Sequence, residues 1–254
     1  MKHELLGSFF SNMAMFIFYS YKRQRSEKII LLLSHCRKNR KKQSKQLNQK
    51  TQICKRCFKE IKDATFHNLL HSDVSLCHKC LSELKPVFNE FKIGDIKCLN
   101  IYWYTDTIQG LLYQFKGCTD YELKDTFLDY YNEYISLKYH GYIMIPAPSS
   151  EEANKERGFN QVVEMFSKVK LPMYCCIHKR NDFKQHSLNS KERSEVKNLL
   201  KIDNIDLSKK KILIVDDVYT TGATVKSMIE LIKKKNPHKI QVLVMAKTID
   251  LDLR

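Results

Sequence analysis

The chain has 254 residues, of which 43% are hydrophobic, and its 44 basic and 28 acidic residues give a formal net charge of +16. This length and apolar content allow one α/β domain with a small appendage, and no apolar run approaches the ~18–20 residues of a membrane-spanning helix. Nine cysteines in a chain this long, without a recognisable secretory signal, do not indicate a disulfide scaffold. A reducing cytoplasm is therefore the expected location.

Residues 1–50 carry most of the excess charge, with 12 basic and 2 acidic residues. The part from 37 to 46 is charged and has no apolar anchor, which predicts disorder. Two interpretations of this basic extension are a nucleic-acid-binding arm and a poorly ordered extension from a start codon placed too early. The lack of aromatic residues where the charge is densest favours the second.

Two Cys-x-x-Cys pairs follow within residues 51–85, Cys54 with Cys57 and Cys77 with Cys80. Each pair can place two thiolates on one tight turn, and two pairs supply the four sulfur ligands of tetrahedral zinc. The 19 residues between the pairs fit the spacing of a zinc ribbon. Redox-active pairs are the competing interpretation, but the basic flanks favour zinc. The sequence predicts a closed, structural four-cysteine site that stabilises a segment too short to build its own core.

Helix-like and strand-like patterns alternate through residues 100–254. Residues 107–115 predict a helix, 142–145 a short buried strand that ends in Pro-Ala-Pro, 160–169 a helix, and 240–246 another apolar strand. This alternation indicates an α/β fold, in which helices flank a parallel sheet. Ligands in such folds bind beyond the carboxyl ends of the strands.

The strongest functional signal is KILIVDDVYTTGAT, residues 211–224. Its apolar residues 212–215 predict a buried strand, and Asp216 and Asp217 follow where that strand is expected to end. These carboxylates suit neutral hydroxyls or a magnesium ion, and not a phosphate. No G-x-x-x-x-G-K-[ST] or G-x-G-x-x-G run occurs, so a P-loop or dinucleotide site is unsupported.

A hydroxyl-rich turn separates the two acids from a helix whose apolar face repeats at helical spacing. First-turn N–H groups, threonine hydroxyls and a glycine able to take positive φ can together hold a phosphate. The turn consists of Thr220, Thr221, Gly222, Ala223 and Thr224. Two carboxylates beside a phosphate-binding turn indicate a sugar-phosphate site. A solvated acid pair before an ordinary threonine N-cap is the alternative, and it explains single features but not their order.

This run resembles the phosphoribosyl-pyrophosphate (PRPP) motif of type I phosphoribosyltransferases. In that family the acids hold the ribose hydroxyls and the loop holds the 5-phosphate, while magnesium accompanies PRPP. The resemblance implies the first role for Asp216 and Asp217 and the second for residues 220–224.

The order of the remaining motifs resembles the ComF family of competence proteins. After the cysteine pairs come YQFK at 113–116, IPAP at 145–148, RGFNQ at 157–161 and QHSL at 185–188. Members of this family couple a zinc ribbon to a type I phosphoribosyltransferase-like domain and act in the uptake of transforming DNA. The resemblance spans about residues 52–248 and implies single-stranded DNA and a competence helicase as partners.

Pyrophosphate-binding candidates follow from the same resemblance. They are Ala147, Pro148 and Ser149 at a strand exit, and Arg157, whose guanidinium can fork onto phosphate oxygens. From the residues alone, the proline-rich exit is equally a rigid turn, and Arg157 is a surface arginine at an expected helix entrance.

Five further candidates carry two interpretations each. Lys116 is a snorkelling surface lysine or a ligand contact, and Asn160 is a helix cap or, like Gln161, a site residue. Gln185 and Arg193 lie in a stretch too charged for a core, and the resemblance makes this stretch a hood or flexible loop over the site.

Two functions remain open on the sequence. One is an enzyme that transfers the phosphoribosyl group, and the other is a protein that holds PRPP without turnover. No residue stands out as a general base, and the sequence does not identify the molecule that would accept the phosphoribosyl group. The prediction is therefore a competence role with a sugar-phosphate site.

Overall fold

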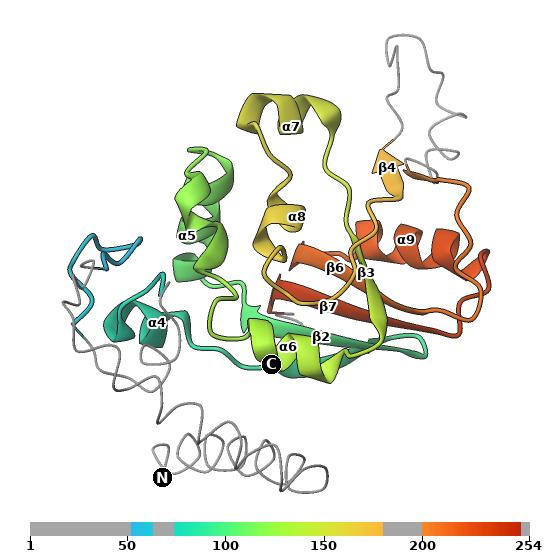
Figure 1. Ribbon diagram of the computed structural model, residues 1–254, viewed down its shortest axis with the longest axis horizontal. Helices are drawn as coiled ribbons and strands as arrows, with labels where there is room; N and C mark the ends of the chain where they lie inside the picture. The colour runs from blue at the N-terminus through green and yellow to red at the C-terminus, as the bar shows by residue number, and fades with distance from the viewer. Residues whose placement is uncertain (1–51, 63–73, 180–199, 250–254) are drawn as a thin grey trace, which may run out of the picture. The chain divides into compact units, whose positions relative to one another are not determined.

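The computed structural model describes residues 52–62, 74–179 and 200–249 (Figure 1). The basic extension, residues 1–50, lies outside this described part, as do Gln185 and Arg193. Within the described residues, no helix is both long and apolar enough to cross a membrane.

A five-stranded sheet organises the described chain, in the order β1-β2-β7-β6-β3. Strand β1 runs antiparallel to β2, and the other neighbours are parallel. The strands are β1 (Asn89–Ile93), β2 (Ile96–Trp103), β3 (Tyr142–Pro146), β6 (Lys211–Tyr219) and β7 (Lys239–Lys247). A mostly parallel sheet with helices confirms the predicted α/β class.

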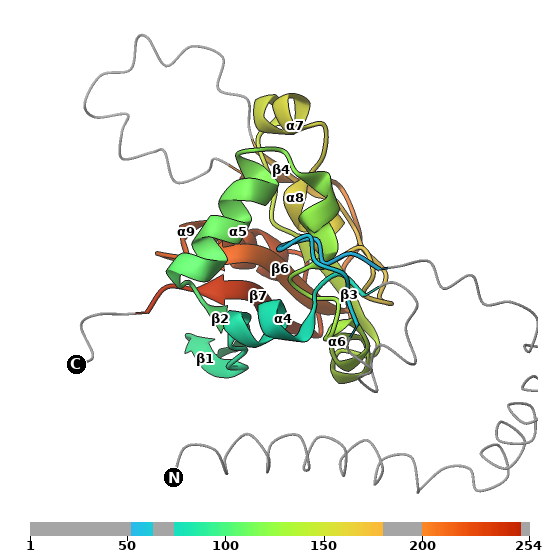
Figure 2. The same cartoon turned by 90° about the vertical axis from the view of Figure 1, so that its left-hand side faces the viewer.

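Helices cover both faces of this sheet (Figures 1 and 2). A separate antiparallel hairpin, β4 with β5, follows the edge strand β3 along the chain. The remaining elements are α4 (His78–Leu84), α5 (Asp106–Lys116), the 3-10 helix η1 (Tyr121–Asp125), α6 (Asn132–Lys138), α7 (Glu151–Arg157), α8 (Gln161–Met165), β4 (Ile177–Lys179), β5 (Leu200–Ile202) and α9 (Ala223–Lys233).

Alternation along β6 divides the core into two layers. Leu213 and Val215 join the cluster that holds the buried faces of α5, α6 and α8, whereas Ile212 and Ile214 join the cluster that holds α9. Successive side chains of a strand point to opposite faces, so one fully apolar strand serves both layers. The predicted helices at 107–115 and after residue 222 are confirmed, with their apolar faces buried.

Two element boundaries differ from the sequence expectation. Strand β6 does not end before the acid pair, because its ladder with β7 continues to the pairing of Tyr219 with Lys247. Both acids therefore lie within the strand. The helix expected at 160–169 is shorter, since α8 ends at Met165.

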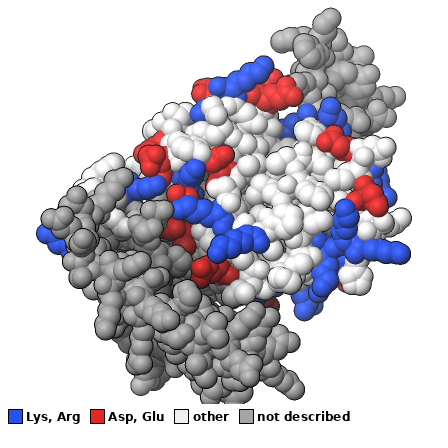
Figure 3. Space-filling model, in the orientation of Figure 1, with Lys and Arg blue, Asp and Glu red and all other residues white. Residues whose placement is uncertain are grey.

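Charge is unevenly placed on the described surface. Figure 3 shows a group of lysine and arginine side chains at its right-hand end, over the starts of β6 and β7. The acid pair lies toward the other end of the same strand, β6.

Candidate functional site

Asp216 and Asp217 form a buried acid pair in the last part of β6, with less than a tenth of each residue exposed. The Asp217 N–H donates to Asp216 Oδ1 at 2.8 Å, and the Val218 N–H donates to Asp217 Oδ1 at 2.6 Å. Burial, and next the charge of Asp217, raise the pKa of Asp216 well above its usual range. These surroundings therefore favour the protonated form of Asp216.

Lys116 supplies the positive charge of the site. It is the last residue of α5, and its ammonium group forms an ion pair with the Asp217 carboxylate. Its side chain is 29% exposed, so the ammonium lies inside the site with access to solvent. Of the two interpretations left open for Lys116, the structure favours a place in the site.

Gln161 connects the acid pair to the pyrophosphate candidates. Its Oε1 accepts hydrogen bonds from the Ser149 hydroxyl at 2.8 Å and from the Arg157 guanidinium. Its Nε2 donates to Asp217 Oδ2 at 3.5 Å, which is a weak contact. The structure therefore brings Lys116, Ser149, Arg157 and Gln161 together around Asp217.

The turn from α7 to α8 positions Arg157 and Gln161. Arg157 ends α7, and Gly158 follows with φ +81°, a left-handed conformation that suits glycine at a helix C-terminus. Arg157 is therefore the last residue of one helix and lies just before the start of the next, which was expected at residue 160. The entrance is at Asn160, whose Oδ1 accepts the N–H groups of Val162 and Val163 at 3.1 and 3.2 Å. Asn160 is an N-cap.

Aromatic packing fixes this turn against α5. The ring of Phe159 stacks on Phe115 with centroids 5.1 Å apart, and Tyr121 meets Phe159 edge-on at 5.2 Å. Phe115 is buried and directly precedes Lys116. These contacts hold Lys116 and the Arg157–Gln161 turn in one frame. The sequence motif contained Phe159, but nothing in it identified the partner ring.

Gly222 shapes the start of the phosphate-binding candidate. It is the N-cap residue of α9, with φ +73°, where a residue with a Cβ is strained. A Cβ there would also collide with the ring of Tyr219. Tyr219 thus contributes to the turn, a role that its place three residues before the glycine did not reveal.

The rest of the turn is open to solvent. Thr221 Oγ1 accepts the Ala223 N–H at 3.4 Å, and Lys226 Nζ donates to the Thr221 carbonyl oxygen at 3.2 Å. The exposed residues are Thr220, Thr221, Ala223 and Thr224. First-turn N–H groups point out of the helix and favour an anion, and the Lys226 ammonium adds charge. The turn can accept a phosphate.

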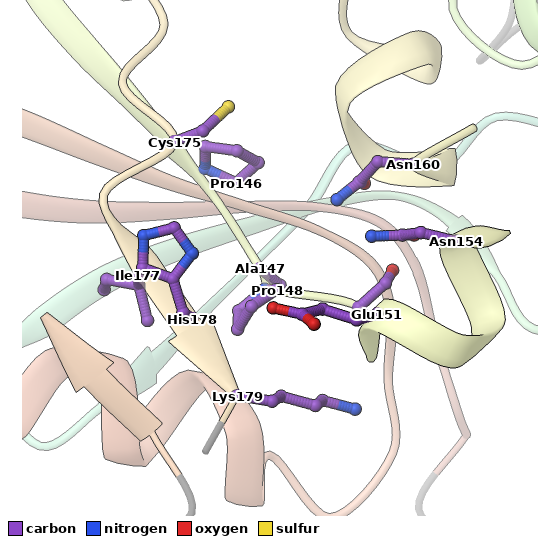
Figure 4. A pocket seen from close by; sticks show the side chains of 11 residues that line it. Pro146, Ala147, Pro148, Glu151, Asn154, Asn160, Cys175, Ile177, His178 and Lys179 are labelled. Atoms are coloured by element: carbon purple, nitrogen blue, oxygen red, sulfur yellow. The ribbon is translucent and has the colours of Figure 1, made fainter. Parts of the chain in front are cut away.

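A pocket lies beside the strand exit that follows β3. It holds about 490 Å³ of empty space, partly open to solvent, and Pro146, Ala147, Pro148 and Ser149 line it. Figure 4 shows Asn154 and Asn160 on one side and His178 and Lys179 on the other. The acid pair does not line this pocket, but the Ser149 hydrogen bond to Gln161 joins the two regions.

The four predicted cysteines come together at the start of the described chain. The sulfur atoms of Cys54, Cys57, Cys77 and Cys80 all lie within 4.8 Å of one another, and Cys57 Sγ is 3.8 Å from Cys77 Sγ. Tetrahedral zinc with Zn–S bonds of about 2.3 Å separates its sulfur ligands by about 3.8 Å. These residues fit a metal ion such as zinc.

Electrostatics at the cluster differ from one thiol to the next. Burial acts to raise the pKa of Cys54, but N–H groups of Cys77, Cys57 and Arg56 outweigh it and lower the pKa to about 7. Burial raises the pKa of Cys77 and Cys80. Thiolates are the form that binds metal, so a metal ion at this cluster would displace protons from Cys77 and Cys80.

The cysteine segment is anchored to the sheet domain. Cys54, Leu76 and Cys80 belong to the same buried cluster as α5. The Ser75 N–H and hydroxyl both donate to Asp129 Oδ2, at 3.0 and 2.6 Å. The segment thus shares its core with the domain.

Comparisons with known proteins agree with this architecture. The phosphoribosyl transferase domain family matches residues 156–250. Competence protein ComFC of Bacillus subtilis (strain 168) is 26% identical over 203 residues, which cover 68% of this chain and 85% of that protein. Competence protein ComFC of Streptococcus pneumoniae (strain ATCC BAA-255 / R6) is 26% identical over 147 residues, 58% of this chain and 66% of that protein.

Solved structures that are similar to this chain include a hypoxanthine phosphoribosyltransferase from Staphylococcus aureus. It has 11% identity and a TM-score of 0.34, over 50% of this chain and 74% of that one. A hypoxanthine-guanine phosphoribosyltransferase from Bacillus anthracis has 13% identity and a TM-score of 0.32 over 50% and 75%. TM-scores this low do not support a conclusion about the fold or function of this chain.

The resemblance to the ComF family is confirmed: the chain has curated relatives named competence protein ComFC, a match to the phosphoribosyl transferase domain family over residues 156–250, and a four-cysteine cluster consistent with a zinc ribbon.

Proposed function

We propose that this chain binds PRPP or a related sugar phosphate together with magnesium, and that this binding serves DNA uptake. The observation that carries the proposal is the acid pair in β6 followed at once by the open turn at the start of α9. The ribose diol contacts Asp216 and Asp217, and the 5-phosphate lies in the turn of residues 220–224.

The pyrophosphate end of the ligand lies toward Ser149 and Arg157. Both donate to Gln161 Oε1 in the structure, so both can exchange that acceptor for phosphate oxygens. Magnesium prefers oxygen ligands and shares them with substrate phosphates. Lys116 pairs with Asp217 until the ligand arrives, and then neutralises part of the pyrophosphate charge.

Three further proposals complete this function. The segment 51–85 is a structural zinc ribbon ahead of a phosphoribosyltransferase-like domain at 100–254. The protein acts in the cytoplasm with single-stranded DNA and a competence helicase. The basic extension, residues 1–50, is incidental to ligand binding.

Transformation frequency tests the role. In a transformable host that depends on this chain, Asp216→Ala/Asp217→Ala should reduce transformation at unchanged protein level. Asp95→Ala/Glu133→Ala removes the same charge from two exposed positions and should have no effect. Full transformation with the acid-pair variant would refute a role for the site.

Turnover as a phosphoribosyltransferase is the second candidate function. The observation in its favour is Asn154, which lines the pocket and whose buried Oδ1 has no hydrogen-bond partner among the described residues. A hydrogen-bond donor on the molecule that receives the phosphoribosyl group would satisfy this oxygen. Release of pyrophosphate from PRPP, stimulated by nucleobases and reduced in Asn154→Ala, supports turnover; release no faster than in buffer refutes it.

A further inference from the structure

Seven lysines form one surface at the end of β6 opposite the acid pair. They come from the start of β6, the end of α9 and the start of β7. This lysine patch consists of Lys209, Lys210, Lys211, Lys233, Lys234, Lys235 and Lys239.

Backbone contacts bring the three segments together. Lys211 and Lys239 are partners across the parallel pair β6–β7, where strands lie about 4.8 Å apart. The Lys210 carbonyl accepts the His238 N–H at 2.9 Å, and the Lys209 N–H donates to the Asn236 carbonyl at 3.4 Å. The patch is therefore one surface, although its members are up to 30 residues apart in the sequence.

The charge of the patch is little compensated nearby. Segments 207–211 and 231–239 contain no acidic residue, and none of the seven lysines forms an ion pair with a described residue. Two acids flank the patch. Hydrogen bonds from Ser208, and then the charges of Lys210 and Lys235, lower the pKa of Asp206. Exposed Glu230 lies three and four residues before Lys233 and Lys234 in the sequence, so two negative charges stand beside seven positive ones. A cation in the last turn of α9 complements the helix dipole, which accounts for one lysine of the patch.

Two aromatic rings accompany these charges. Lys210 Nζ lies 5.6 Å from the ring centroid of Tyr174, and Lys211 Nζ lies 5.9 Å from that of Tyr142. Tyr174 is half-buried, so part of this residue is exposed to solvent, whereas Tyr142 is buried. Exposed cations beside an aromatic ring are the usual elements of a surface for single-stranded nucleic acid.

We propose that the lysine patch binds the phosphate backbone of single-stranded DNA, at the end of the sheet opposite the sugar-phosphate site. The identity of the ligand as DNA rests on the proposed function, whereas the location of the binding surface rests on the lysine patch alone. Lys211 and Asp217 are six residues apart along β6, which corresponds to about 20 Å, so the two ligands occupy separate surfaces and bind at the same time.

Fluorescence anisotropy with a labelled oligo-dT strand tests this on the full chain. Lys209→Ala/Lys211→Ala/Lys239→Ala should weaken binding at least ~10-fold, and the slope of log K against log salt should become less negative by about 2. The matched control is Lys138→Ala/Lys155→Ala/Lys170→Ala, three exposed lysines elsewhere. It should retain affinity within about 2-fold. Equal losses in both variants, no loss in either, or tight binding only to anionic vesicles would overturn the proposal.

Titration of PRPP with magnesium into the same samples separates the two sites. The patch variant should bind PRPP as the wild type does, and PRPP should not displace the DNA. Displacement would place the DNA in the sugar-phosphate site and overturn the patch. A wild type that binds DNA through the patch but does not bind PRPP would refute the proposed function alone.

Discussion

The cysteine cluster and the acid pair each bring together buried side chains that bind a ligand as anions, thiolates at the cluster and carboxylates in the acid pair. The two regions differ in how this negative charge is compensated. The acid pair already has a cation, since Lys116 pairs with Asp217. At the cluster, backbone N–H groups lower the pKa of Cys54 to about 7 against the effect of burial, while burial raises the pKa of Cys77 and Cys80. The acid pair is thus compensated by a lysine of the same chain, whereas a metal ion that binds the cluster would have to displace protons from Cys77 and Cys80.

Removing one cysteine should produce the largest effect. Cys57→Ser should abolish binding of about one metal ion per chain, because a closed site needs four ligands. Metal binding contributes on the order of 10 kcal/mol in small zinc domains, so a loss of several kcal/mol is expected here. Metal analysis and thermal unfolding measure both. Cys118→Ser, at an exposed thiol outside the cluster, is the control and should change neither; a metal-free, fully stable wild type would contradict the account.

A methyl group at Gly222 should have the next largest effect. Gly222→Ala should destabilise the chain by about 2–3 kcal/mol, from left-handed strain and the collision with Tyr219, and should weaken PRPP binding. Gly110→Ala, in the middle of α5 where a Cβ meets nothing within 4 Å, should stabilise it by about 0.5–1 kcal/mol. Urea unfolding compares the two. Equal effects would show that the turn at Gly222 is not specially shaped.

Removal of the Lys116 ammonium tests whether the acid pair depends on a cation from its own chain. Lys116→Ala should cost about 1–2 kcal/mol, because the Asp217 carboxylate stays largely buried and loses a charged partner. Lys138→Ala breaks an exposed ion pair with Glu90 and should cost less than about 0.5 kcal/mol. Denaturant unfolding provides both values. A cost for Lys116→Ala no larger than that for Lys138→Ala would mean that the acid pair does not depend on Lys116.

Substitution of Asp216 should change the pH dependence of stability. Burial and the charge of Asp217 raise its pKa, so between about pH 4 and that raised pKa the folded state holds more protons than the unfolded chain. Stability contributed by this group is complete below about pH 4 and falls as the pH rises, by at most about 1.4 kcal/mol per pH unit. Unfolding measured against pH should show a shallower fall in Asp216→Asn. Asp95→Asn, at an exposed position, should keep the wild-type profile.

Local patterns in the sequence predicted much of this architecture. The apolar faces of α5 and α9 followed from helical spacing, and the four cysteines from their two short pairs. Both signals depend on neighbours in the sequence. The acid pair was placed correctly near the carboxyl end of a parallel strand, although the ladder with β7 carries the strand past it.

Contacts between distant segments were beyond these patterns. Whether Lys116 reaches Asp217 depends on how α5 packs, which Phe115 and Phe159 settle by stacking. The lysine patch likewise exists because Lys211 and Lys239 start neighbouring strands. Sequence spacing identifies such residues singly, but only the fold places them together.

Isothermal titration calorimetry with PRPP and magnesium measures whether the acid pair binds the sugar phosphate. The wild type should bind one PRPP per chain, Asp216→Ala/Asp217→Ala should lose that binding, and Asp95→Ala/Glu133→Ala should keep it. A wild type that produces no binding heat, or an acid-pair variant that binds PRPP as tightly as the wild type, would contradict the account.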